Sequence, residues 1–105
     1  MDDVIVRGGE NMSPGEIEDV LLTHEGLIDA CVIGVPDEQW GEAVAAVVVP
    51  RKGSNPSAAE LQQWVKDRLR SSRTPERVEF WEELPYNETG KLLRRKVREA
   101  FQASD

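Results

Sequence analysis

Seven consecutive apolar residues, Ala43 to Val49, constrain the fold of this chain more than any other feature. A strand with one face in water alternates apolar and polar residues, whereas an unbroken apolar run is typical of a strand covered on both faces. A chain of 105 residues can bury one core. The sequence therefore predicts a single domain, residues 1–105, built around a buried strand.

Three further segments are predicted to be strands. Leu27 to Val35 is apolar enough for a second buried strand, which Pro36-Asp37 should close. Val4-Ile5-Val6 predicts a short strand that runs into a glycine turn. Residues 77–80 alternate charged and apolar side chains, the pattern of a half-buried strand.

Three helices are predicted between and after these strands. Ser13-Pro14-Gly15-Glu16 and Pro56 to Glu60 both have the pattern of a capping box at a helix start. The first helix should end near His24, and the last should follow Lys91. The apolar stripes of the three helices are Ile17, Val20 and Leu21, then Leu61, Trp64, Val65 and Leu69, then Leu93, Val97, Ala100 and Phe101. We expect an α+β fold, a small mixed or antiparallel sheet with about three helices packed on it.

The charge distribution limits the possible partners. A formal net charge of −7 argues against nucleic acid as the main partner. Basic residues nevertheless gather in residues 91–98, where a solvated helix face accounts for Arg95 and Arg98. A cation in the first turn of a helix, as expected of Lys91, opposes the helix dipole. An anionic partner across an interface would remove this conflict.

Three features of the sequence bear on cellular location. No apolar run is long enough to span a bilayer, and the acidic start Met1-Asp2-Asp3 lacks the basic residues of a signal peptide. Cys31 is the single cysteine, so it cannot form an internal disulfide, and its apolar surroundings predict a buried, inert thiol. We therefore expect a cytoplasmic protein with no transmembrane segment.

Two turns are the candidate functional features. The loop Pro85 to Lys91 brings a lysine to an exposed tip, and Gly8-Gly9 lets backbone approach a ligand closely. Neither is a nucleotide-binding signature, because the loop lacks the first glycine and the Ser or Thr of a P-loop, and the glycine pair lacks a third glycine. His24 is the one histidine and is expected to cap helix carbonyls, so no metal site is predicted.

Three motifs in order give the chain a family resemblance over practically its whole length. The chain resembles the C-terminal domain of the adenylate-forming superfamily, which includes acyl-CoA synthetases, aryl-CoA ligases, luciferases and peptide-synthetase adenylation domains. Among these it is most similar to AMP-forming fatty-acid–CoA ligases. The matching segments are Asp2 to Asn11 with Pro14, Glu16 and Glu18; Val32 to Glu38 with Trp40-Gly41-Glu42; and Leu84 to Lys91.

The resemblance implies a reaction in two half-steps. ATP, bound with Mg²⁺, and a carboxylic acid give an acyl-adenylate and pyrophosphate, and a thiol, usually CoA, then displaces AMP. The family's small domain rotates between the steps and presents opposite faces to one active site. Lys91 matches the catalytic lysine of adenylation, where an ammonium in a water-poor cleft stabilises charge on phosphate oxygens. Thr89 and Gly90 beside it are implied to contact the same cofactor.

The thiol half-step is implied to use the other motifs. Gly8 and Gly9, with Glu10, match the turn that lines the pantetheine tunnel, although a hairpin turn that needs positive φ explains the glycines equally. Trp40 either lies near the thiol or packs on its own domain. Many relatives contact the CoA nucleotide through the segment that matches Ser72-Arg73-Thr74. Arg73 is the one charged residue that this chain keeps there, so the segment offers little to bind CoA. A phosphopantetheine on a carrier protein is therefore an alternative thiol. Asp2 matches the hinge.

The resemblance also implies what this chain does not contain. The acyl pocket, the adenine site and the phosphate-binding loop belong to a large N-terminal domain, so we expect that domain to be the partner and the isolated chain to be inactive. The acid that is activated cannot be read from these residues. An alternative is a stand-alone interaction module that docks an acidic partner through its basic last helix; RNA is disfavoured because no aromatic residues interleave that helix. Acetylation of Lys91 would switch off adenylation by removing its charge.

Overall fold

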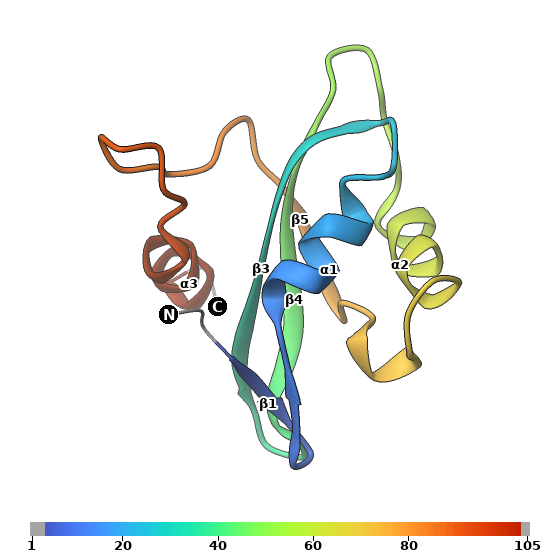
Figure 1. Cartoon of the computed structure of the whole chain (residues 1–105), viewed down its shortest axis with the longest axis vertical. Coiled ribbons are helices and arrows are strands. Elements are labelled where there is room, and N and C mark those ends of the chain that lie inside the picture. The colour runs from blue at the N-terminus through green and yellow to red at the C-terminus, as the bar shows by residue number, and fades with distance from the viewer. Residues whose placement is uncertain (1–3, 104–105) are drawn as a thin grey trace.

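A three-stranded sheet forms the centre of the molecule. The computed structural model describes residues 4–103. Strand β4 (Gly41–Pro50) lies between β3 (Leu27–Asp37), which pairs with it antiparallel, and β5 (Arg77–Phe80), which pairs with it parallel. The prediction of a small mixed or antiparallel sheet is confirmed, and the sheet is mixed, with the apolar strand at its centre (Figure 1).

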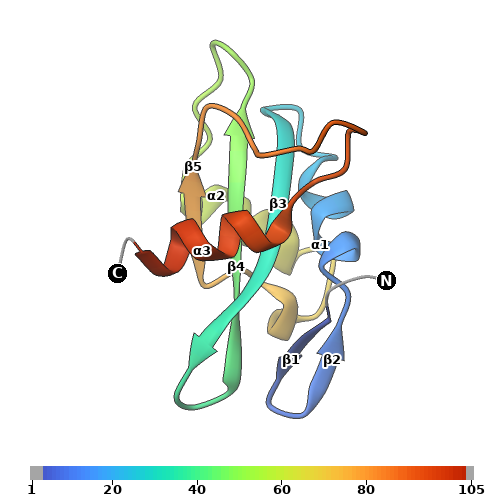
Figure 2. The same ribbon diagram turned by 90° about the vertical axis from the view of Figure 1, so that its left-hand side faces the viewer.

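Helices cover both faces of this sheet, which explains the unbroken apolar run in β4. Helices α1 (Pro14–Leu21) and α2 (Ala58–Lys66) lie on one side, and α3 (Arg94–Ala103) lies on the other (Figures 1 and 2). Successive β4 side chains point to opposite faces. One apolar cluster therefore contains Val44, Ala46 and Val48 with Ile17, Leu21, Leu61 and Val65, and the other contains Ala45, Val47 and Val49 with Val97 and Phe101.

The two predicted capping boxes have different outcomes. Ser57 precedes α2, and its hydroxyl oxygen accepts a hydrogen bond from the Glu60 N–H at 3.0 Å, which is the predicted cap and one of the two bonds of a capping box, whereas the Glu60 carboxylate pairs with His24. Ser13 precedes α1 with Pro14 at the first helical position, but the Ser13 side chain makes no capping bond, so that capping box was a wrong prediction. The Glu16 carboxylate, which would complete the box, bonds to Arg73 instead.

Helix α1 ends earlier than the sequence indicated. Its last residue is Leu21, and His24 lies beyond it in the connection to β3. The His24 side chain does not cap helix carbonyls: its Nδ1 accepts a hydrogen bond from the Gly26 N–H, and its Nε2 lies 2.7 Å from a Glu60 carboxylate oxygen. The capping role expected of His24 was therefore wrong, and the ring instead connects the start of β3 to α2.

A second, two-stranded sheet contains the glycine turn. Strands β1 (Ile5–Arg7) and β2 (Glu10–Met12) pair antiparallel around Gly8 and Gly9. Both glycines have positive φ, +59° and +83°, the conformation that a two-residue hairpin turn requires. The strand at β1 was predicted, whereas β2 was not, because its three residues show no apolar alternation. Ile5 and Met12 are buried in the same cluster as α1 and α2, which anchors the hairpin.

Side chains from both helical layers cover the free edge of β3. A Glu18 carboxylate oxygen accepts the Val32 N–H at 2.8 Å, and Arg98 donates to the Gly34 carbonyl at 3.3 Å. Residues 32 and 34 therefore direct their backbone groups away from β4, and Pro36 follows in the same alternation. A proline is tolerated there because no ladder N–H is needed. For this reason β3 continues through Pro36 instead of closing at it.

Candidate functional site

Lys91 lies at the closing end of a small exposed hairpin loop. Tyr86 and Leu92 form an isolated antiparallel bridge at its base, and the Leu93 N–H donates to the Pro85 carbonyl at 3.0 Å. Gly90 in the tip has φ of +84°, which disfavours any other residue. The Lys91 side chain is exposed to solvent. The loop therefore presents an ammonium group outside the domain core.

The position of Lys91 relative to the last helix differs from the prediction. Helix α3 begins at Arg94, so Lys91 precedes the helix and is not in its first turn. The unfavourable helix-dipole interaction expected of Lys91 instead applies to Arg94. The Arg94 guanidinium forms a bidentate pair with the Glu18 carboxylate, which neutralises charge at this helix start. The helix dipole therefore gives no reason to expect an anion near Lys91.

The base of the lysine loop is tied to the sheet. The Tyr86 hydroxyl donates a hydrogen bond to the Asp29 carboxylate of β3. Partial burial of the hydroxyl, and then this bond, raise the pKa of Tyr86 to about 12. Leu84 and Leu92, on either side of the loop, pack against the apolar cluster under α3. The loop is thus exposed at its tip and fixed at its base.

The glycine turn packs against Trp40. The Gly8 N–H donates to the Trp40 carbonyl at 2.8 Å, and a Cβ added at Gly8 would lie 3.0 Å from the indole ring. The Arg7 guanidinium lies over the same ring, 4.5 Å from its centroid. Trp40 therefore packs on its own domain, one of the two interpretations left open, while 38% of it remains exposed. No atom of residues 4–103 lies within 4 Å of a Cβ built on Gly9, so Gly9 faces open space in the part of the chain that the structure describes.

Glu10 and Arg73, both predicted to contact cofactor, are brought together by the fold. Their side chains form an ion pair of 2.6 Å, and Arg73 also lies 3.3 Å from Glu16. The hydrogen bond from Arg73 lowers the pKa of Glu10, and the bond to Glu10 raises the pKa of Arg73. The Arg73 charge thus faces carboxylates of its own chain. Sequence reasoning missed this pairing because 63 positions separate the two residues.

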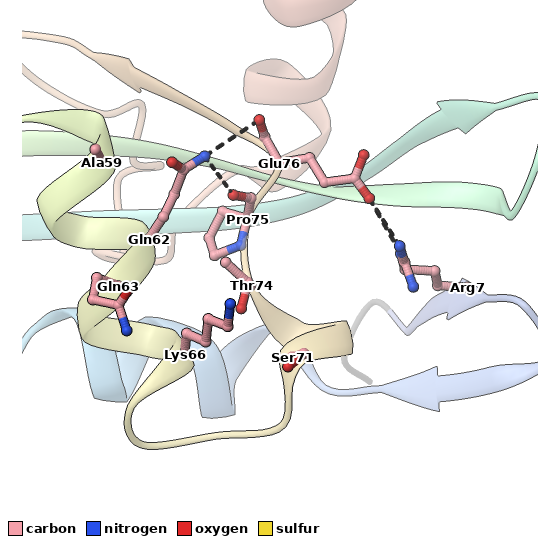
Figure 3. Close-up of a pocket in the computed structure, with 9 residues that line it drawn as sticks. All are labelled: Arg7, Ala59, Gln62, Gln63, Lys66, Ser71, Thr74, Pro75 and Glu76. Atoms are coloured by element: carbon pink, nitrogen blue, oxygen red, sulfur yellow. Dashed lines mark hydrogen bonds and ion pairs between the residues drawn. The ribbon is translucent and has the colours of Figure 1, made fainter.

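A hollow of about 530 Å³ lies between α2, residues 71–76 and Arg7, and sequence reasoning did not find it. Figure 3 shows that Glu76 reaches across to Arg7 of β1, a 3.0 Å ion pair, while the Gln62 amide of α2 donates to the Pro75 carbonyl at 3.0 Å. The Thr74 hydroxyl is buried and has no hydrogen-bond partner among the described residues. The hollow is lined by Arg7, Ala59, Gln62, Gln63, Lys66, Ser71, Thr74, Pro75 and Glu76.

The predicted site residues fall into two groups at opposite ends of the molecule. In Figures 1 and 2 the β1–β2 hairpin lies at the lower end, and the loop between β5 and α3 lies toward the upper end. Lys91, Thr89 and Gly90 belong to the upper loop. The lower group comprises Gly8, Gly9, Glu10, Trp40 and Arg73. Asp2, the predicted hinge, lies outside the described residues.

Three other features of the described residues bear on the sequence predictions. Cys31 is buried as expected, and burial above all raises the pKa of its thiol to about 12. Within residues 4–103, no cluster of three His, Cys, Asp or Glu side chains could hold a metal ion. No helix in the same part of the chain is long and apolar enough to cross a membrane.

Comparison with known proteins identifies the family. The model of the AMP-binding enzyme C-terminal domain matches residues 16–91. A fatty acid–[acyl-carrier-protein] ligase, ScoC, of Streptomyces coeruleorubidus is 46% identical over 99 residues, which are 94% of this chain and 19% of that protein. A feruloyl-CoA synthase of an Amycolatopsis species is 44% identical over 94% of this chain and 20% of that protein.

Solved structures agree with this assignment. An acyl-CoA synthetase of Brucella canis superposes with a TM-score of 0.91 at 35% identity, over 99% of this chain and 20% of that chain. MatB of Rhodopseudomonas palustris also gives a TM-score of 0.91 at 35% identity, over 95% of this chain and 20% of that chain. This chain therefore spans about a fifth of the length of these relatives. By sequence and by fold, it belongs to the C-terminal domain family of AMP-binding, adenylate-forming enzymes.

Proposed function

We propose that this chain is the mobile lid of an AMP-forming acid–thiol ligase, most like an acyl-CoA synthetase. The lid serves two half-reactions on a large N-terminal domain. The observation that carries this proposal is the placement of two exposed turns at opposite ends of the molecule (Figure 2). A rotation of the lid between the half-reactions would bring first one turn and then the other to a single active site. Asp2 is the proposed hinge.

In the first half-reaction Lys91 acts as the catalytic cation. A carboxylate oxygen of the substrate attacks the α-phosphorus of ATP, and the bond to pyrophosphate breaks. Negative charge then shifts onto phosphate oxygens, and an ammonium held beside them lowers the barrier. The described residues offer no cluster of metal ligands, so this chain would supply Lys91, and Mg²⁺ would enter with ATP on the large domain. Thr89 and Gly90 shape the loop that carries the lysine.

In the second half-reaction the glycine turn lies along the thiol. The sulfur attacks the acyl carbon of the adenylate, and AMP leaves. Gly9 faces open space, so a narrow pantetheine chain can pass close to its backbone. Trp40 supports this turn from its own domain, and Glu10 with Arg73 holds the second strand of the hairpin. Relatives named for CoA and for acyl carrier protein both match this chain, so the thiol is CoA or a carrier-protein phosphopantetheine.

The decisive experiment separates the two half-reactions in the enzyme formed by this chain and its large domain. Lys91→Ala is expected to lower pyrophosphate release by about 10²- to 10³-fold and to spare thioester formation from supplied acyl-adenylate. Lys96→Ala, an exposed lysine of α3, is the matched control and should leave both rates unchanged. Equal losses in both half-reactions would refute the division of roles.

A substitution in the glycine turn should affect the other half-reaction. Gly9→Leu should lower thioester formation and spare pyrophosphate release, because a side chain at this position enters the proposed path of the thiol. Gly53→Leu is a closely matched control: Gly53 has φ of +86°, Gly9 has +83°, and neither has an atom within 4 Å of its added Cβ. Thioester formation that stays normal in Gly9→Leu would contradict the tunnel assignment. The isolated chain, assayed in parallel, should show no turnover.

A further inference from the structure

Asn87 makes five hydrogen bonds inside the lysine loop. Its Oδ1 atom accepts three hydrogen bonds: from the Thr89 N–H at 3.0 Å, the Thr89 hydroxyl at 2.8 Å and the Lys91 N–H at 2.9 Å. Its backbone N–H donates to the Lys91 carbonyl at 2.9 Å, and its own carbonyl accepts from the Gly90 N–H at 3.0 Å. A single side chain and its backbone therefore organise the loop tip.

These contacts converge on the backbone of Lys91. Both of its backbone groups, the N–H and the carbonyl, bond to Asn87. The Lys91 Cα is thus fixed relative to Asn87, and only the torsions of the lysine side chain remain free. Asn87 is itself held, because the neighbouring Tyr86 bonds to Asp29 of β3 and pairs with Leu92. A continuous chain of contacts joins the sheet to the lysine backbone.

The chemistry of asparagine suits this task. A side-chain oxygen one methylene from the backbone can bond to the N–H two residues ahead, the geometry of an Asx turn. Alanine at this position would leave three donors without their acceptor, including the Lys91 N–H. The tip is exposed to water, so the domain would stay folded while the loop gained freedom.

We propose that Asn87 is a positioning residue for the adenylation step. By holding both backbone groups of Lys91, it sets where the ammonium group meets the reacting phosphate. This inference rests on the proposed function of Lys91. The rate depends steeply on such placement, since a displacement of about 1 Å can cost about 10²-fold in a reaction of this kind. Asn87 itself touches neither ATP nor the acid.

The test uses the enzyme formed by this chain and its large domain, with ATP and a carboxylic acid as substrates. Asn87→Ala should lower kcat for pyrophosphate release by about 10-fold to 10²-fold. The KM for ATP and the rate of thioester formation from supplied acyl-adenylate should be unchanged. Asn87→Asp, which keeps the accepting oxygen, should recover most of the lost rate. Asn55→Ala, the same change in another exposed loop, is the matched control.

A second measurement reports the loop directly. Amide hydrogen exchange at Lys91 should be at least about tenfold faster in Asn87→Ala than in the wild type, with exchange in β4 unchanged. If Asn87→Ala failed to fold, Asn87→Ser, whose hydroxyl is a shorter and weaker acceptor, should still show faster exchange at Lys91 than the wild type. Unchanged exchange at Lys91 would show that Asn87 does not hold it and would overturn the inference.

Lys91→Ala, measured beside these variants, distinguishes the positioning role of Asn87 from the proposed catalytic role of Lys91. If Lys91→Ala abolishes adenylation and Asn87→Ala does not alter it, the positioning role is wrong and the proposed function stands. Equal losses in both half-reactions of Asn87→Ala, with no recovery in Asn87→Asp, would overturn the positioning role as well. If Lys91→Ala has no effect on adenylation, both proposals fail.

Discussion

Replacing Glu18 by alanine is expected to destabilise this domain strongly. Glu18 is 8% exposed, and its carboxylate is the acceptor for three N–H groups. One is the Val32 N–H on the free edge of β3, at 2.8 Å, and two belong to the Arg94 guanidinium at the start of α3. The residue thus joins α1, the sheet and the helix that follows the lysine loop.

The magnitude follows from these contacts. A neutral hydrogen bond contributes about 1 kcal/mol, and hydrogen bonds to charged groups contribute about 1.5–3 kcal/mol. The Arg94 side chain keeps 20% of its surface exposed, so water compensates part of its loss. We therefore expect Glu18→Ala to lower the free energy of unfolding by about 3 kcal/mol. For a domain of this size that loss corresponds to a decrease in Tm of roughly 12–24 °C.

Urea unfolding of the 105-residue chain, followed by tryptophan fluorescence, measures this free energy. The midpoint should fall while the slope m stays constant, because the surface exposed on unfolding is nearly unchanged. Glu18→Gln keeps one accepting oxygen and should give an intermediate loss. Asp19→Ala is the control, an exposed carboxylate one residue away on α1. A loss below about 1 kcal/mol in Glu18→Ala would refute the reasoning, since an exposed pair gives as much.

Three further perturbations probe other contacts. Tyr86 is the single tyrosine, so ultraviolet titration of the chain should show one phenol ionising near pH 12, and a midpoint near 10 would contradict its burial and hydrogen bond. Gly8→Ala should lower the free energy of unfolding in urea by about 1–2 kcal/mol, because alanine is strained at φ of +59° and its Cβ would lie 3.0 Å from Trp40. An unchanged free energy of unfolding would contradict this packing. Arg73 lowers the pKa of Glu10, so the Glu10–Arg73 ion pair should stabilise the fold above about pH 4.5, and this stabilisation should be lost as the pH falls further. The difference in unfolding free energy between wild type and Glu10→Gln should therefore shrink below pH 4.5, and a constant difference would contradict the expectation.

Local patterns predicted the architecture well. The run Ala43 to Val49 became the central strand, and Ser57 caps α2 as its spacing indicated. Such patterns work because burial follows the strand and helix periods within one segment. They failed where a competing partner lay far along the chain. The Glu16 carboxylate did not complete a capping box, because it bonds to Arg73, which lies 57 positions away.

Some features of the candidate site could likewise be predicted from local sequence, and others could not. Lys91 at an exposed tip and the positive φ of Gly8 and Gly9 could be predicted, since proline, asparagine and glycine set turns locally. The three hydrogen bonds to the Asn87 side chain could not be predicted, because they depend on the atomic path of the loop. The hollow beside Arg7 could not be predicted from the sequence either, because its lining residues in β1 and α2 are far apart in the chain and meet only in the folded domain.

By itself, then, the sequence determined which segments are buried, where the chain turns and which side chains are available for chemistry. These properties follow from side-chain polarity and backbone torsions, which act over a few residues. Tertiary structure alone decided that the lysine loop and the glycine turn lie at opposite ends of the molecule, and that Glu10 and Arg73 neutralise each other. Such relations depend on how the helices pack on the sheet, because packing sets the distances between residues that are far apart in the chain.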